Sequence, residues 1–388
     1  MRLDGVRVLD LSRLLPGPYA TQLLADAGAD VIKVEDTDAG DYARILPPYT
    51  ETGVGAIFDA VNRGKRSVAL DLKSTRGREA FLDMAAEADV VFEQFRPGVV
   101  DRLGVDYEAV REVNEDVIYC SLSGFGQDGP HADRVGHDLN YVGMSGLLDM
   151  TRADEDSTPQ MPGYPVGDMA GGLFAAFSVV GALLSRELGN TGGEYVDVAM
   201  TDVVASFSQA VAHDALTGEN PRPGETELSG GLPWYDTYET ADGNYVTLAA
   251  LEPKFWETFC EAVDREDLAD AHMTGDPAER EAVREELESL FAERTREEWE
   301  QELGETEAMV APVRTPAEAL GSEAADARDL IDHSGTVPRV AFPAQSTAEP
   351  DGATGVPPGH GEHTDDVLEA AGYDADRIAT LREDGVIE

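Results

Sequence analysis

The sequence predicts an α/β protein with a parallel sheet in its first half and a smaller α+β domain in its second. Short β-branched runs alternate with helical stretches through the first 200 residues. This alternation is typical of βαβ units, whose helices cover the faces of a parallel sheet. After residue 200 the pattern changes to a polar stretch rich in Gly and Pro, a hairpin signal and helices rich in Glu and Arg. That change marks the start of the second domain.

Each expected element has a local signature in the chain. β-Branched and aromatic runs predict strands at residues 6–11, 30–35, 67–72, 89–93, 117–123 and 195–199. Periodic apolar residues predict helices at residues 19–27, 76–88, 169–187, 254–263, 278–294 and 364–371. Extended runs at residues 234–240 and 245–249 flank Asp242-Gly243, a typical hairpin turn. We therefore expect a large domain of residues 1–200 and 325–388 and a small domain of residues 201–324.

The charge of the chain restricts its partners and its habitat. Acidic residues number 77 against 29 basic ones, so the formal net charge is -48. Phosphate groups would repel such a surface, which argues against nucleic acid or an anionic membrane as partner. The acids are spread along apolar-patterned sequence and do not form a tail. We expect a halophilic protein, because at 1 M salt a screening length of roughly 3 Å suppresses self-repulsion.

Cysteine content and hydropathy indicate the compartment. The two cysteines, Cys120 and Cys260, are too few and too far apart for a disulfide framework or a metal cluster, so we expect buried apolar roles and no metal. The N-terminus opens on a strand-like run without the basic and apolar regions of a signal peptide. No run approaches the roughly twenty apolar residues of a membrane span. These features predict a cytoplasmic protein.

Two glycine-flanked segments carry the candidate catalytic residues. The segment GHDLNY, at residues 136–141, contains His137, and the segment GDMAGG, at residues 167–172, contains Asp168. An imidazole and a carboxylate on opposite sides of a carbon suit a proton that is taken from one face and returned to the other. Glu252 is a third candidate acid or base. Racemisation next to a carbonyl is one such reaction.

Structural roles compete with each of these functional readings. His137 is also consistent with a structural histidine, and Glu252 with a solvated loop acid. Asp168 precedes an apolar helix, where an Asp is the ordinary N-cap. The two roles of Asp168 are compatible, because a helix N-terminus presents free N–H groups that can stabilise an enolate oxygen.

A glycine loop and two groups of cations suggest further sites. The run GFGQDG at residues 124–129 matches a dinucleotide fingerprint after a strand, but Pro130 follows and no apolar helical period does, so a flexible loop beside a site is the better interpretation. Basic residues are scarce and gather at two places, residues 63–73 and 96–102. Arginine binds phosphate with paired donors, so these groups are candidates for phosphate contacts, with surface salt bridges as the alternative.

Taken together, these residues resemble CoA-transferase family III, also called the CaiB/BaiF family, and within it the α-methylacyl-CoA racemases. The motifs that carry the resemblance are VLDLSRLLPGP (8–18), LLADAGADVIKVE (23–35), NRGKRSVALDLK (62–73), FRPGVVDRLGV (95–105), SGFGQDGP (123–130) and GGEYVDVAM (192–200). The resemblance implies a Rossmann-like large domain completed by a C-terminal return, a small domain between, and two interlocked subunits. It also implies an acyl-CoA substrate and no separate cofactor.

The racemase subfamily is favoured by GHDLNY, by GGLPWYDTYETADG (230–243) and by LEPKFW (251–256). Transferases of the family are similar at Asp168, where the carboxylate acts as a nucleophile, but they usually lack the histidine. By this resemblance His137 and Asp168 are the acid/base pair, and Glu252 from the other subunit supports His137. The same resemblance assigns substrate and CoA contacts to Arg13, Leu70, Lys73, Phe95, Arg96, Arg102, Asp138 and Tyr141.

The chain departs from the family pattern at two places. Asp36 and Thr37 follow the KVE strand where the family often has an arginine for the adenosine phosphates, and the lead-in to Gly167 is less rich in proline. We expect a racemase of 2-methyl-branched acyl-CoA thioesters in lipid metabolism. A CoA-transferase acting through Asp168 is the main alternative, and an acyl-CoA-binding protein without turnover is a weaker one. Methionines such as Met144 and Met169 suit either an adaptable acyl pocket or a plain core.

Overall fold

The computed structural model describes residues 2–335, 337–348 and 355–388, and the chain divides into two compact units. The first unit consists of Met1–Leu147, Pro162–Phe207 and Glu323–Glu388, and the second of Leu148–Met161 and Ser208–Ser322. The C-terminal segment thus belongs with the N-terminal half of the chain. The segment Leu148–Met161, which we expected in the large domain, is grouped with the small one instead.

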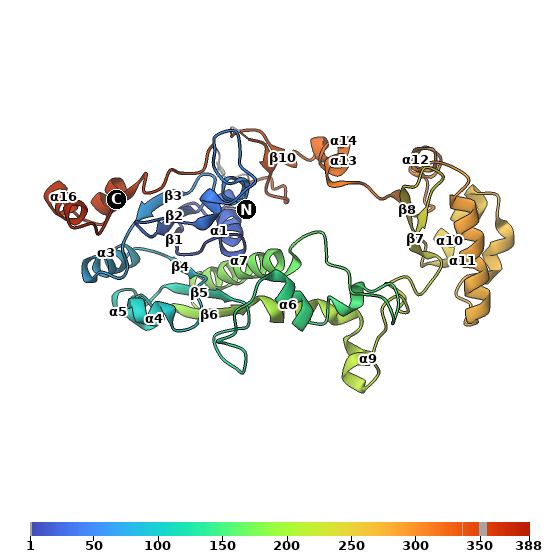
Figure 1. The fold of residues 1–388 in the computed structure, drawn as a ribbon, viewed down its shortest axis with the longest axis horizontal. Helices are drawn as coiled ribbons and strands as arrows, with labels where there is room; N and C mark the ends of the chain where they lie inside the picture. The colour runs from blue at the N-terminus through green and yellow to red at the C-terminus, as the bar shows by residue number, and fades with distance from the viewer. Residues whose placement is uncertain (1, 336, 349–354) are drawn as a thin grey trace. The chain divides into compact units, whose positions relative to one another are not determined.

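A six-stranded parallel sheet forms the centre of the first unit (Figure 1). In spatial order its strands are β3 (Arg66–Ala69), β2 (Asp30–Glu35), β1 (Arg7–Asp10), β4 (Val90–Glu93), β5 (Ile118–Ser123) and β6 (Glu194–Ala199). This is the strand order of doubly wound Rossmann folds, in which the direction of winding reverses between β1 and β4. The predicted parallel sheet is confirmed. β3 is shorter than expected, because Leu70 forms an isolated bridge with Ile387 of the C-terminal segment.

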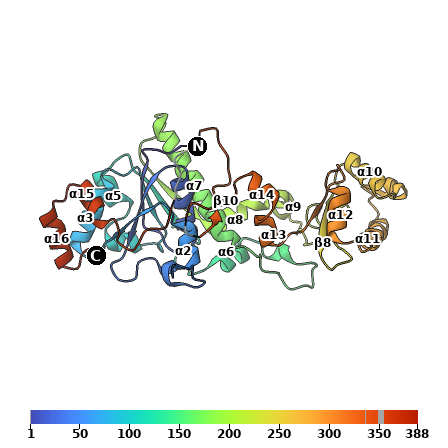
Figure 2. The ribbon, with the colours of Figure 1, turned by 90° about the horizontal axis from the view of Figure 1, so that it is seen from above.

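Helices cover both faces of this sheet, each over its own hydrophobic core (Figure 2). One core contains side chains of α3 (Thr75–Ala85), α4 (Val99–Leu103), α5 (Tyr107–Val113), α15 (Thr364–Ala370) and α16 (Ala375–Glu383). The other contains side chains of α1 (Pro16–Asp26), α6 (Asp138–Met144), α7 (Val166–Glu187) and α8 (Met200–Ala205). The unit is completed by α2 (Ala56–Val61), which packs against α1, and by α14 (Glu323–Ala327), β10 (Ile331–Asp332) and β11 (Arg339–Val340). The C-terminal helices therefore return to cover the N-terminal sheet.

The long helix α7 combines a tightly packed face with an exposed apolar one. A Cβ at Gly172 would lie 2.4 Å from the Pro16 carbonyl oxygen, so glycine allows the close crossing of α7 and α1. The exposed face carries large apolar side chains at helical spacing: Leu173, Phe174, Phe177, Val180 and Leu184. Contrary to our expectation from the sequence, one helix within the described residues, α7, is long and apolar enough to cross a membrane by length and composition. The core helix of a soluble protein passes the same test.

The second unit has a three-stranded antiparallel sheet with helices. The strands, in spatial order, are β7 (Tyr235–Glu239), β8 (Tyr245–Ala249) and β9 (Val310–Pro312). The helices are α9 (Ala212–Thr217), α10 (Pro253–Ala262), α11 (Pro277–Phe291), α12 (Arg296–Leu303) and α13 (Pro316–Leu320). The chain's three tryptophans, Trp234, Trp256 and Trp299, are buried in its core. The predicted hairpin is confirmed: β7 pairs with β8, and Gly243 takes a φ of 72° in the turn between them.

Candidate active site

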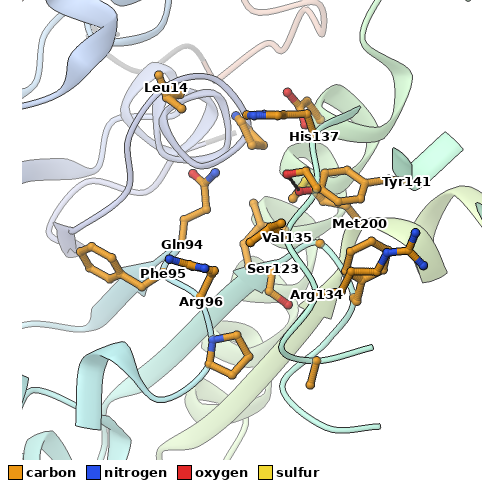
Figure 3. Close-up of a pocket in the computed structure, with 18 of the residues that line it drawn as sticks. Leu14, Gln94, Phe95, Arg96, Ser123, Arg134, Val135, His137, Tyr141 and Met200 are labelled. Carbon is orange, nitrogen blue, oxygen red and sulfur yellow. Dashed lines mark hydrogen bonds between the residues drawn. The ribbon is translucent and has the colours of Figure 1, made fainter. Parts of the chain in front are cut away.

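A cavity of about 330 Å³ opens at the carboxyl ends of β1, β4 and β5 (Figure 3). This is the reversal point of the sheet, where ligands of open α/β folds bind. Its walls come from the first unit alone, and they are Arg13, Leu14, Pro16, Gln94, Phe95, Arg96, Pro97, Leu122, Ser123, Gly124, Phe125, Ala132, Arg134, Val135, Gly136, His137, Tyr141, Asp168 and Met200. The predicted residues His137, Asp168, Arg13, Phe95, Arg96 and Tyr141 are among them.

Buried ion pairs hold the loop between β1 and α1 at the cavity. The buried carboxylate of Asp10 accepts hydrogen bonds from Thr21 Oγ1 (2.6 Å) and Lys65 Nζ (3.2 Å). Burial opposes the ionisation of Asp10, but the charges of Lys65 and Lys33 outweigh burial and lower its pKa to about 2. The loop is therefore held in place by Asp10, Thr21 and Lys65, which are buried beneath the surface of the protein.

The same loop stores backbone strain next to the cavity. Leu14 has a φ of 66°, and its N–H donates to Asp41 Oδ1 at 2.9 Å. Asp41 is in turn paired with the buried Lys33 at 2.9 Å. A left-handed conformation in a bulky residue costs about 1–3 kcal/mol and persists only where the surroundings enforce it. This buried pair supplies that enforcement.

His137 lies where the glycine loop after β5 meets α6. It is the N-cap residue of α6, its backbone N–H donates to Asn140 Oδ1 at 3.0 Å, and its side chain is exposed on the cavity wall. The loop at residues 124–129 does not lead directly into a helix, because α6 begins only at Asp138. The geometry thus agrees with our interpretation of this loop as a glycine segment beside a site.

Tyr141 fixes this part of the wall by packing against two glycines. Its hydroxyl donates to the Gly136 carbonyl oxygen at 2.6 Å, and its ring meets Phe125 edge-on with centroids 5.3 Å apart. A Cβ at Gly124 would lie 2.4 Å from the Tyr141 ring, and one at Gly136 would lie 2.9 Å from it. Burial, together with the charges of Asp168 and Asp138, raises the pKa of Tyr141 to about 12. Tyr141 therefore acts as a neutral hydrogen-bond donor near neutral pH.

Asp168 lies in the first turn of α7, and its position corrects one prediction. The N-cap of α7 is Pro165, and Asp168 is the third residue of the helix. The capping carboxylate belongs instead to Asp138, whose Oδ1 accepts the Asp168 backbone N–H at 3.0 Å. A Cβ at Gly167 would lie 3.0 Å from that oxygen, so Gly167 allows the two helix ends to approach.

This arrangement raises the pKa of Asp168. Burial is the main cause and the neighbouring charge of Asp138 the second, and together they raise the pKa from 3.8 to about 7. A group with a pKa near the working pH is present in both protonation states, as general acid–base catalysis requires. Asp168 is thus suited to proton transfer at neutral pH.

Unpaired cations gather at the cavity in a strongly acidic chain. Eight of the 29 lysines and arginines have no carboxylate within 4.0 Å among the described residues. These eight are Arg13, Lys73, Arg78, Arg96, Arg102, Arg134, Arg280 and Arg328. Three of them, Arg13, Arg96 and Arg134, line the cavity. Because 77 acidic residues compete for them, cations left unpaired at one cavity favour an anionic ligand such as a phosphate ester.

The basic residues at positions 63–73, which are candidates for phosphate contacts, are largely buried or paired with carboxylates. Arg63 and Lys65 are buried and paired with Asp59 and Asp10, and Arg66 is paired with Asp30 at 2.6 Å. These cations therefore bind carboxylates of the fold and are not available to a ligand. Lys73 alone of this group stays exposed without an ion pair among the described residues.

The five other predicted site residues are not among the residues that line the cavity. Leu70 is 1% exposed in the core beneath α3, so its side chain cannot contact a ligand there. Lys73 and Arg102 are exposed, and Asp138 is half-buried. Their contacts with CoA stay predictions. Glu252 is the exposed N-cap residue of α10 in the second unit, and its role also stays a prediction.

Asp36, which follows β2 where the family often has an arginine, has a local structural role. Asp36 Oδ1 accepts the backbone N–H groups of Asp38, Ala39 and Gly40 at 2.9–3.1 Å. The carboxylate thus closes the turn after β2.

The predicted site residues make up six of the nineteen residues of the wall, and those that sequence reasoning missed include Gln94, Arg134 and Met200. Gln94 had a usable signal, since it directly follows the strand VVFE and so lies at the carboxyl edge of a parallel sheet. Met200 had the same signal, since it directly follows β6, whereas Arg134 lies in a loop with no such marker. Among the described residues, no group of three or more His, Cys, Asp or Glu side chains is arranged to hold a metal ion.

Known proteins resemble this chain over nearly its whole length. The pattern of CoA-transferase family III matches residues 3–364. A succinyl-CoA:mesaconate CoA-transferase of Haloarcula hispanica is 36% identical over 95% of this chain and 96% of its own. Human α-methylacyl-CoA racemase is 33% identical over 100% of this chain and 98% of its own.

A solved structure supports the same assignment. A CaiB/BaiF family protein from Brucella suis superposes with a TM-score of 0.82 at 31% identity, covering 95% of this chain and 99% of its own. The chain therefore belongs to CoA-transferase family III, the CaiB/BaiF family.

Proposed function

We propose that this enzyme is an acyl-CoA racemase that exchanges the configuration at C2 of 2-methyl-branched acyl-CoA thioesters. The observation that carries the proposal is that His137 and Asp168 line one cavity. One of them removes the C2 proton and the other returns a proton to the opposite face. Unpaired Arg13 and Arg96 on the same wall suit the phosphates of CoA.

The properties of Asp168 and of the end of α7 support this chemistry. A pKa of about 7 lets Asp168 act as either acid or base. The backbone N–H groups of Val166 and Gly167 have no acceptor among the described residues, and they lie at the positive end of the α7 dipole. They are suited to an enolate oxygen near this helix end. Every step of the proposed reaction is a proton transfer, so the proposal invokes no metal or redox cofactor.

A CoA-transferase is the second candidate, and the Haloarcula relative favours it. In that reaction the Asp168 carboxylate attacks the thioester carbonyl and carries the acyl group. Two features favour the racemase over the transferase. A carboxyl group with a pKa raised to about 7 is only partly ionised at neutral pH, which weakens a nucleophile. The His137 imidazole also has a place on the wall that the transferase route does not use.

Incubation of one epimer of a 2-methylacyl-CoA in deuterated water tests the proposal. We expect both epimers with deuterium at C2, without any added carboxylic acid. His137→Ala should abolish epimerisation, and His131→Ala is the matched control, because His131 is an exposed histidine of the same loop that does not line the cavity. Turnover only with an acceptor acid, together with inactivation by hydroxylamine, would establish the transferase.

The roles of the two bases can be separated by face. If each base serves one face of C2, His137→Ala keeps exchange without inversion for the epimer whose proton faces Asp168. Asp168→Asn should show exchange for the opposite epimer only. Proton NMR of each purified epimer in deuterated water measures both rates. Equal residual exchange of both epimers in either variant would exclude the two-base mechanism.

We also propose that the working form is a homodimer. The exposed apolar face of α7 forms a stripe, and soluble monomers rarely leave such a large apolar patch open. Phe177, 68% exposed at the centre of this stripe, is the residue to change. Phe177→Asp should convert a dimer into a monomer in sedimentation velocity, whereas Leu216→Asp, at an 86% exposed position of α9, should not.

The proposed support of His137 by Glu252 of a second subunit has its own test. Chains with His137→Ala and chains with Glu252→Ala should each be inactive. Co-refolded mixtures should regain activity, because a mixed dimer keeps one intact site. A fully active monomer would contradict both the dimer and this role of Glu252.

We further propose that the enzyme works in a salt-rich cytoplasm, as its charge predicts.

A further inference from the structure

Gln94 is the first residue after β4 and projects into the cavity from the edge of the sheet (Figure 3). Its Oε1 accepts the backbone N–H of Gly17 at 3.0 Å, in the first turn of α1. Its position brings a polar group to the point where the winding of the sheet reverses.

The contact with Gly17 sets the orientation of the Gln94 amide. A Cβ at Gly17 would lie 2.5 Å from Gln94 Oε1 and 2.3 Å from Ser12 Cβ, so only glycine fits there. Because the Gly17 N–H is a donor, the atom that faces it must be the amide oxygen. Nε2 then carries two N–H donors, for which the described residues offer no acceptor and which are accessible from the cavity.

We infer that Gln94 Nε2 donates a hydrogen bond to the carbonyl oxygen of the acyl-CoA thioester and stabilises the negative charge that develops there. The inference rests on the proposed function only in requiring an acyl thioester as substrate. The side-chain amides of Asn and Gln are among the donors that stabilise charge on a carbonyl oxygen when they are held in place before the reaction. The Gly17 N–H provides that hold.

The charge on the oxygen follows from either candidate reaction. In racemisation a base takes the C2 proton, the C–H electron pair forms a C1–C2 double bond, and the carbonyl π pair moves onto oxygen. Return of a proton to C2 reverses these movements. In CoA transfer, attack by the Asp168 carboxylate places the π pair on the same oxygen, until the C–S bond breaks and the thiolate leaves. Gln94 stays neutral throughout and only donates hydrogen bonds.

The variant Gln94→Glu separates the donor from the structural contact. The new carboxylate still accepts the Gly17 N–H but has no N–H to offer. We expect kcat to fall about 10²- to 10³-fold with little change in KM, the range for loss of one oxyanion donor. Gln301→Glu is the control, because Gln301 is an exposed glutamine of α12. If Gln94 served only to hold α1, Gln94→Glu would keep parental kcat, and the inference would be overturned.

Binding gives a second readout that does not depend on turnover. We expect the parent to bind an acyl-CoA thioester about three- to tenfold more tightly than the matching S-alkyl-CoA thioether, which lacks the carbonyl oxygen. Calorimetry with Gln94→Glu should show this ratio reduced to about one, and Gln301→Glu should preserve it. A parent without racemase or transferase activity would refute the proposed function alone. An unchanged binding ratio in Gln94→Glu would refute the role of Gln94 alone.

Discussion

Replacing Asp138 by Asn should move the pH dependence of the enzyme in a defined direction. Asp138 accepts the Asp168 backbone N–H at 3.0 Å, and its charge is the second cause of the raised pKa of Asp168. Asn keeps an oxygen for this hydrogen bond and removes the charge. The variant should therefore fold normally while the pKa of Asp168 falls.

The size of the effect follows from the order of the two causes. The pKa of Asp168 is raised from 3.8 to about 7, with burial contributing more than Asp138. Removal of the smaller contribution should lower the pKa by about one unit, which corresponds to about 1.4 kcal/mol. Molar salt should leave most of this shift in place, because partly buried charges are screened far less than exposed ones.

The assay is kcat/KM against pH between 5 and 9, which reports ionisation in the free enzyme. The limb that reports Asp168 should move to lower pH by about one unit in Asp138→Asn. Asp133→Asn, at an exposed carboxylate of the same loop, should leave the profile unchanged. A limb that stays in place or moves to higher pH in Asp138→Asn would refute the assignment of the Asp168 pKa to these causes.

Three further predictions concern stability. Folding raises the pKa of Asp168, so the parent loses stability as the pH rises from about 4 to 8. Asp168→Asn should therefore become more stable relative to the parent over this pH range, as urea midpoints would reveal. A difference in stability that stays constant with pH would contradict this. Gly172→Ala should destabilise by about 1–3 kcal/mol, because its Cβ would meet the Pro16 carbonyl oxygen at 2.4 Å. Gly181→Ala in the same helix would bring its Cβ within 4 Å of no other atom of the same chain, so in the monomeric Phe177→Asp background it should stabilise by about 0.5–1 kcal/mol. Equal effects of the two glycine substitutions in thermal unfolding would argue against the close helix crossing. Dilute buffer should unfold the protein that molar salt keeps folded, whereas an unchanged melting temperature would remove the halophile argument.

The parallel sheet was predictable because burial on both faces leaves a direct mark on the sequence. The run DVIKVE gave the bounds of β2, and each other strand of this sheet was found within three residues. The C-terminal helix α16 was missed, because it buries only Ile378 and Leu381 and is otherwise polar. An apolar period that weak does not stand out from a loop.

Site residues were predictable only where neighbouring residues in the sequence, such as flanking glycines, marked them. Flanking glycines pointed to His137 and Asp168, and both line the cavity. The assignment of Asp168 as N-cap was wrong, because the capping carboxylate comes from Asp138, thirty residues earlier. Likewise Lys65 and Arg66 were grouped by sequence proximity, although their partners Asp10 and Asp30 are distant along the chain. Pairings of this kind depend on the fold and leave no local pattern.

The glycines of the site connect its packing to its chemistry. Gly167 allows the Asp138 carboxylate to reach the end of α7, and this approach both caps the helix and raises the pKa of Asp168. Gly17 allows the Gln94 oxygen to reach the end of α1, and this contact turns the amide donors toward the cavity. In each case a missing side chain lets a polar group meet a helix N-terminus, and the polar group is then fixed before substrate arrives. Substitution of either glycine should therefore disturb catalysis even though neither glycine carries a reacting atom.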